Sequence, residues 1–102
     1  MSTNKDYLNS LLDQLSSLEG ITYRMMMGEY VIYFRGKVAA YVCDNRLLIK
    51  PVPAAINMLP HAEYDSISQG GRKKLLRIDN VDDRDFLTDL FNAIYDALPF
   101  SK

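Results

Sequence analysis

The sequence predicts an α+β fold, a two-layer sandwich in which an N-terminal and a C-terminal helix pack on an antiparallel meander sheet. Three observations predict it. Apolar residues recur at helical spacing near both ends of the chain, they alternate with polar residues in the middle, and short turn sequences interrupt that alternation. Because 102 residues is the length of one domain, we expect a single domain over residues 1–102.

The first expected element is an amphipathic helix from about Asn4 to Glu19. Gly20 suits the left-handed conformation in which many helices end. Five leucines recur at spacings of three and four residues, which places them on one helix face. They are Leu8, Leu11, Leu12, Leu15 and Leu18.

The apolar period then changes to two residues, which predicts four consecutive strands. Arg35–Gly36 and Asp44–Asn45 are expected to form hairpin turns, and both residues of the second pair tolerate positive φ. The expected strands span Ile21–Met27, Tyr30–Phe34, Lys37–Cys43 and Arg46–Lys50.

Regular alternation in the third strand predicts which of its side chains share a face of the sheet. It places Val38, Ala40 and Val42 on one face. Ala39, Tyr41 and Cys43 are then expected on the other.

Prolines follow the fourth strand and divide the next segment. Pro53 fits the first turn of a short helix over Ala54–Leu59, which Pro60 ends. Two interpretations of the next residues stay open, a short edge strand or an irregular segment. These uncertain residues are Ala62–Ser68, followed by an expected loop at Gln69–Gly71 and a last strand at Lys73–Ile78.

The last expected element is a helix that Asn80 or Asp82 caps and Pro99 stops. Acidic residues occupy its first turn, where the helix dipole favours negative charge. Its apolar stripe consists of Phe86, Leu87, Leu90, Phe91, Ile94, Tyr95 and Leu98.

The composition excludes several classes of protein. Hydrophobic residues make up 48% and charged residues 25%, as in soluble globular domains. Twelve basic residues against thirteen acidic ones give a net charge of -1, which argues against a protein that binds nucleic acid mainly by charge. Because no apolar run is long enough to span a bilayer and the N-terminus is polar, we expect a cytoplasmic protein without membrane contact.

The residues that carry chemistry are few. One cysteine and one histidine cannot form an intrachain disulfide or a Cys/His zinc site. A catalytic pair of Cys43 and His61 is disfavoured, since a proline-bounded helix separates them and a free cysteine is usually a small packed hydrophobe. We therefore expect no enzymatic activity, no metal and no cofactor.

The distribution of charge leaves a binding surface as the open hypothesis. The middle of the chain is basic and both ends are acidic. Gly70–Gly71 followed by three basic residues could contact an anion, although a solvated turn that deters strand aggregation is the alternative. The candidate contacts for a partner or nucleic acid are Arg24, Arg46, Lys50, Arg72, Lys73, Lys74 and Arg77.

The residues from Arg24 to Lys50 resemble the N-terminal domain of the TfoX/Sxy proteins, the competence regulators. The shared pattern is an Arg-x-Met motif at Arg24–Met26, a Gly-Lys hairpin at Gly36–Lys37, and an acidic turn at Asp44 before a strand that ends in lysine. The resemblance covers about residues 4–98.

This resemblance implies a secretion-chaperone-like, two-layer α+β fold that often forms a homodimer. It implies regulation of DNA-uptake genes through a protein partner, such as the transcription machinery or another regulator. It transfers no catalytic residues. Weak direct binding of nucleic acid by the basic residues is the alternative.

Overall fold

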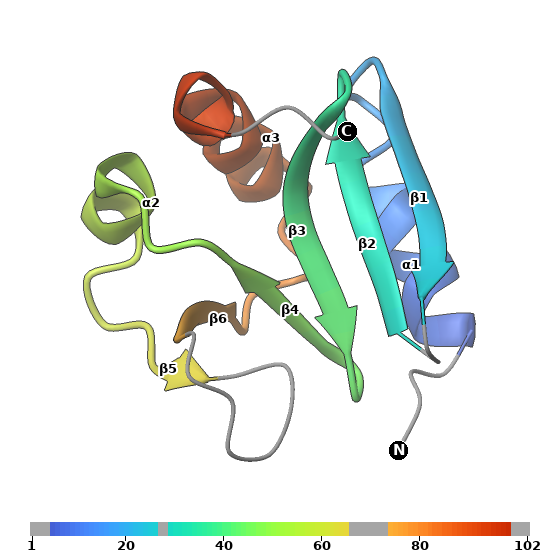
Figure 1. The fold of residues 1–102 in the computed structure, drawn as a ribbon, viewed down its shortest axis with the longest axis horizontal. Coiled ribbons are helices and arrows are strands. Elements are labelled where there is room, and N and C mark those ends of the chain that lie inside the picture. Colours follow the sequence, from blue (N-terminus) through green and yellow to red (C-terminus); the bar gives the residue numbers. More distant parts are fainter. Residues whose placement is uncertain (1–4, 27–28, 66–73, 99–102) are drawn as a thin grey trace.

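The structure, a computed structural model, describes residues 5–26, 29–65 and 74–98. Its described part is an antiparallel sheet with helices on one side (Figure 1), which confirms the predicted α+β class. In chain order the elements are α1 (Lys5–Gln14), β1 (Ile21–Met26), β2 (Glu29–Phe34), β3 (Lys37–Cys43), β4 (Arg46–Ile49), α2 (Pro53–Met58), β5 (Tyr64–Asp65), β6 (Leu75–Ile78), α3 (Arg84–Ile94) and the 3₁₀ turn η1 (Tyr95–Ala97).

The strands lie in the order β1-β2-β3-β4-β6-β5, and all neighbours are antiparallel. The first four strands form the predicted meander. The chain then crosses to β5 at the far edge and returns through β6 to pair with β4. Of the two interpretations of residues 62–68, the described part supports the short edge strand, because Tyr64 and Asp65 pair with β6.

Two tight turns fix the register of the meander. Arg35 and Gly36 have φ values of 52° and 83°, and Asp44 and Asn45 have values of 51° and 58°. Two successive residues with positive φ match the right-handed twist of the strands they join. Both predicted hairpin turns are therefore confirmed.

The first helix is shorter than predicted. It ends at Gln14, and the chain continues in turns whose hydrogen bonds include Ser16 N to Asp13 O and Leu18 N to Leu15 O. Such i to i+3 bonds tighten the end of a helix. Leu15 and Leu18 stay buried, so the predicted leucine face is kept although the helix is not.

Other boundaries shift by a residue or more. β4 ends at Ile49, α2 begins at Pro53, and β6 begins at Leu75. The cap of α3 is Asp83 and not Asn80 or Asp82, because Asn80–Asp83 form a turn of their own and the Asp83 carboxylate accepts from Phe86 N at 3.0 Å. Parts of expected elements at Asn4, Met27, residues 66–73 and Pro99 lie outside the described residues.

A bulge in β3 overturns the predicted division of its faces. Ile32 pairs with Ala40 but Tyr33 pairs with Val38, so Ala39 is an extra residue in the ladder. Ala39 and Ala40 therefore both join the core, so the expected place of Ala39 beside Tyr41 and Cys43 was wrong. Val38 lies opposite Tyr33 on the other face of the sheet, so its expected place beside Ala40 and Val42 was wrong.

The main core fills the space between the helices and one face of the sheet. Side chains of α1, α2 and α3 contact alternate residues of β2, β4 and β6, together with Ala39, Ala40 and Val42 of the bulged β3, in one buried cluster. Phe34 of β2 is 1% exposed and lies 6.4 Å from the ring of Phe91 and 5.2 Å from that of Tyr95, measured between ring centroids. The helices are thereby held on one side, which leaves the opposite side of the sheet without a helical layer in the described part.

Candidate functional site

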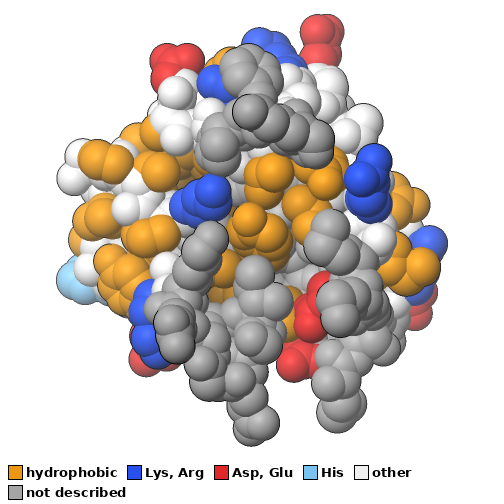
Figure 2. Space-filling view, in the orientation of Figure 1, with side chains coloured by type: hydrophobic (Ala, Val, Ile, Leu, Met, Phe, Trp, Pro, Cys, Tyr) orange, Lys and Arg blue, Asp and Glu red, His pale blue; other side chains and the backbone are white. Residues whose placement is uncertain are grey.

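The candidate site is the open face, by which we mean the face of the sheet that points away from the helices. Strand pairing places Val31, Tyr33, Val38 and Tyr41 on this face of β2 and β3. In the orientation of Figure 1, Figure 2 shows hydrophobic side chains gathered at the centre of this face, with basic side chains on both sides. The face therefore combines an apolar centre with charged flanks.

A second, smaller buried cluster lies on the open face beside this centre. Cys43, Leu48 and Leu75 are buried there, and Tyr41 packs against them. Leu48 lies between Tyr41 on β3 and Arg77 on β6 in the strand register. Because arginine stems cover apolar surface while their guanidinium groups reach polar partners, charged residues can lie directly over these leucines.

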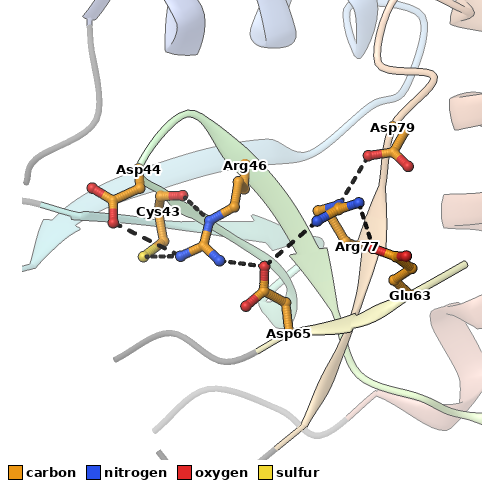
Figure 3. A network of polar contacts seen from close by, with 7 residues as sticks. All are labelled: Cys43, Asp44, Arg46, Glu63, Asp65, Arg77 and Asp79. Atoms are coloured by element: carbon orange, nitrogen blue, oxygen red, sulfur yellow. Dashed lines mark hydrogen bonds and ion pairs between the residues drawn. The ribbon is translucent and has the colours of Figure 1, made fainter. Parts of the chain in front are cut away.

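A network of ion pairs crosses the open face (Figure 3). Two arginines, Arg46 and Arg77, each contact several of its members. Arg46 Nε donates to the carbonyl oxygen of Cys43 at 3.2 Å, and Nη1 donates to the Asp65 carboxylate. Nη2 lies 3.8 Å from Asp44 Oδ2. The hydrogen bond to Asp65 is the main cause that raises the pKa of Arg46 above its ordinary value.

Arg77 is the second arginine of the network. Its Nε donates to Asp79 Oδ1 and its Nη2 to Glu63 Oε2, each at 2.9 Å. Its Nη1 lies 3.9 Å from Asp65 Oδ2. Asp65 therefore bridges Arg46 and Arg77, and so links the short edge strand β5 to β4 and β6.

Cys43 lies under this network as a protonated thiol. Burial is the largest cause that raises its pKa to about 11, and the hydrogen bond to Glu29 acts in the same direction. Arg46 Nη2, 3.5 Å from Sγ, lowers the pKa by less than burial raises it. Because the thiolate is the nucleophilic form, this environment does not activate the cysteine at neutral pH.

His61 belongs to a different part of the molecule. It lines a shallow depression of about 250 Å³ with residues of α2, the start of α3 and the end of β6, and Cys43 is not among the lining residues. In the described ranges, no group of three or more histidine, cysteine or acidic side chains is placed to hold a metal ion.

The seven basic residues singled out from the sequence fall in different places. Arg46 and Arg77 meet at Asp65, whereas Arg24 is exposed on the open face of β1, with β2 and β3 between it and β4. Lys50 is half-buried directly after β4, and Lys74 is exposed directly before β6. Arg72 and Lys73 lie outside the described residues. Binding through these seven residues stays a prediction.

Sequence reasoning missed the acidic partners of the two arginines. Two of them carry a sequence signal. Asp79 lies two residues from Arg77, the spacing of side chains on one strand face, and Asp44 lies in the turn directly before Arg46. Glu63 and Asp65 carry no such signal. Their pairing arises only because β5 folds back beside β6.

Sequence reasoning also missed the role of Lys37, a buried charged residue directly after the Arg35–Gly36 turn. Its Nζ donates to the carbonyl oxygen of Tyr95 at 3.0 Å and lies 4.2 Å from the centroid of the Tyr95 ring. The lysine thus anchors the β2–β3 hairpin to the C-terminal end of the α3 segment. A cation also stabilises the carbonyl end of a helix.

Comparison with known proteins gives one family and one curated relative. The model of the TfoX N-terminal domain matches residues 13–96. An uncharacterised 12.7 kDa protein from the trpE 5′ region of Spirochaeta aurantia is 29% identical over 102 residues, which span 100% of this chain and 89% of that protein. No solved structure gives a significant match. No described helix has both the length and the apolar character that crossing a membrane requires.

Proposed function

The chain belongs to the TfoX N-terminal domain family, and on this premise we propose that it is a non-enzymatic regulatory module that acts by binding a protein partner. The observation that carries the proposal is the open face. An apolar sheet surface with charged flanks is suited to contact with another protein. Cys43, the sole cysteine of the chain, is held as an unreactive thiol beneath that surface.

The proposed process is the expression of DNA-uptake genes in the cytoplasm. Its basis is the resemblance of residues 24–50 to competence regulators, together with the family match. In this role the module contacts the transcription machinery or another regulator, and the partner reads the DNA.

The chemistry of the open face defines the kind of partner. Arg24 on β1 and Lys50 after β4 flank the apolar positions of β2 and β3. In the described part of the chain, no ion pair involves either of these two basic residues. The complementary partner surface carries apolar side chains at its centre and carboxylates at its margins.

Direct binding of nucleic acid is the alternative, and the ion pairs weigh against it. Arg46 and Arg77 already contact carboxylates at hydrogen-bond distance. A phosphate would have to displace these intramolecular partners before it gained the same contacts. A protein partner that approaches the apolar centre leaves the network in place.

The functional test is genetic complementation. We expect deletion of the gene to lower transcripts of DNA-uptake genes, and the unaltered gene to restore them. A variant with Arg24→Glu and Lys50→Glu should fail to restore them, because it reverses the charge on both flanks. Lys5→Glu on α1 is the matched control and should restore them fully. Transcripts unchanged by the deletion would contradict the proposal.

A binding assay separates the alternative. Fluorescence anisotropy with labelled duplex DNA at low salt should show no saturable binding. Binding that weakens steeply with salt and that Arg46→Gln with Arg77→Gln abolishes would instead support nucleic-acid contact.

A further inference from the structure

Strand β1 is the long edge of the sheet. In the described sheet it has a neighbour on one side only, β2. Gly20 O accepts from Arg35 N at 2.9 Å, so Gly20 directs its backbone groups toward β2. By alternation Thr22 and Arg24 do the same, whereas Ile21, Tyr23 and Met25 direct their N–H and C=O groups away from the sheet.

The two edges of the sheet differ in how well they are protected. β5 has two residues, and one of them, Asp65, is charged. β1 has six residues with Arg24 as its one charged side chain, and Tyr23 and Met25 are 43% and 65% exposed. A long edge strand with exposed apolar side chains favours pairing with another strand, which monomeric proteins usually prevent with charges, prolines or short edges.

The sequence of β1 matches its own antiparallel copy in one register. With Tyr23 opposite Tyr23 of a second copy, Ile21 lies opposite Met25 and Thr22 opposite Arg24. Apolar side chains then meet on the helix side of the sheet, and the arginine faces a neutral threonine. This register pairs all three outward-directed residues of each strand.

The neighbouring registers are worse for reasons of charge and length. A shift of two residues in one direction places Arg24 opposite Arg24, and two like charges directly opposite each other repel. A shift in the other direction places Met25 opposite Glu19, beyond the end of the strand. Only the Tyr23 register joins complete strands without a like-charge pair.

From this self-complementarity we infer that β1 pairs with β1 of a second copy about a twofold axis at Tyr23, joining two sheets into one. Such a contact is isologous, as the symmetry of a closed dimer requires. It forms about six backbone hydrogen bonds. The α1 helices of the two copies lie on the same side of the joined sheet, since α1 lies behind β1 and β2 (Figure 1). The inference is independent of the proposed function, because the open face stays accessible.

Sedimentation velocity tests the interface. We expect the unaltered protein to be dimeric at about 100 µM, and Met25→Lys to raise the dissociation constant at least tenfold. Tyr23→Lys, which places two lysines opposite each other, should have the larger effect. The matched control is Tyr64→Lys, which changes an exposed tyrosine at the other edge and should leave the dimer intact. A monomeric unaltered protein, or a dimer that only Tyr64→Lys dissociates, would overturn the inference.

Disulfide trapping tests the register. Tyr23→Cys should give a covalent dimer under mild oxidation, because opposed hydrogen-bonded residues have Cα atoms about 5.5 Å apart, within disulfide reach. Met25→Cys should not, because its counterpart in the second copy lies four positions along the strand, about 13 Å away. Equal trapping of both variants would contradict the register. Cys43 does not compete, since it is fully buried.

Discussion

The two faces of the sheet use the same strands for different purposes. On the helix face, residues of β2, β3, β4 and β6 join side chains of all three helices in one apolar core. On the open face, the remaining residues form a small cluster of Cys43, Leu48 and Leu75, with Arg46, Asp65 and Arg77 beside it. The contrast shows that one face supplies most of the folding energy, which leaves the other available for contacts.

Physical magnitudes support this division. Burial of one large apolar side chain contributes roughly 1.5–3 kcal/mol, whereas an ion pair between partly exposed groups contributes about 0–1 kcal/mol. Arg46, Arg77 and Asp65 retain between 25% and 31% of their side-chain exposure. The network therefore positions residues more than it stabilises the fold.

The largest expected effect is on the helix face. Phe34→Ala removes a fully buried ring that lies next to Phe91 and Tyr95, and leaves a cavity. We expect the free energy of unfolding to fall by about 3–5 kcal/mol, measured by urea denaturation. A loss below about 1 kcal/mol would show that the helix face is not the dominant core.

Lys37 tests the difference between the two faces of the sheet, because it is a charged residue buried on the helix face. Lys37→Met keeps the aliphatic stem but removes the bond to the Tyr95 carbonyl oxygen and the contact with its ring. We expect a loss of about 1–3 kcal/mol in the free energy of unfolding. Lys74→Met, on an exposed lysine, is the matched control and should change it by less than about 0.5 kcal/mol. Equal losses for the two variants would exclude a role for the buried contact.

The pH dependence of the free energy of unfolding tests whether the Cys43 thiol is buried on the open face. Its pKa is about 11 in the folded chain against an ordinary 9.0, so above pH 9 the unfolded state loses the proton first. The contribution of this thiol to the free energy of unfolding should therefore be constant well below pH 9 and fall by about 2 kcal/mol between pH 9 and 11. Cys43→Ala should remove this part of the decrease in parallel urea titrations. Identical pH dependence in both proteins would contradict a desolvated thiol.

The smallest expected effect concerns the ion pairs. Asp65→Asn removes the charge that bridges Arg46 and Arg77. We expect the free energy of unfolding to fall by at most about 1 kcal/mol at low salt, and by less at 1 M salt, where the charges are screened. A loss above about 3 kcal/mol, independent of salt, would place the network in the folding core and end the distinction between the faces.

Contacts of the candidate site were predictable from the sequence only where the two residues lie close together in the chain. The spacing of Arg77 and Asp79 makes their contact predictable. The bridge through Asp65 was not predictable, since it is 19 residues from Arg46 in the chain. Nor was the burial of Lys37, whose acceptor is 58 residues away.

The sequence by itself determined the class of the fold, the leucine face of α1, the two hairpin turns and the order of the first four strands. These features are set by residues close together in the chain. Apolar periodicity determines the helix face and the strands, and the turns need backbone conformations that few residue types adopt. Tertiary structure alone decided that Ala39 bulges, that β6 pairs beside β4, and that carboxylates of distant segments neutralise Arg46 and Arg77. Each of these outcomes is set by which strands become neighbours, and that is a property of the whole packed chain.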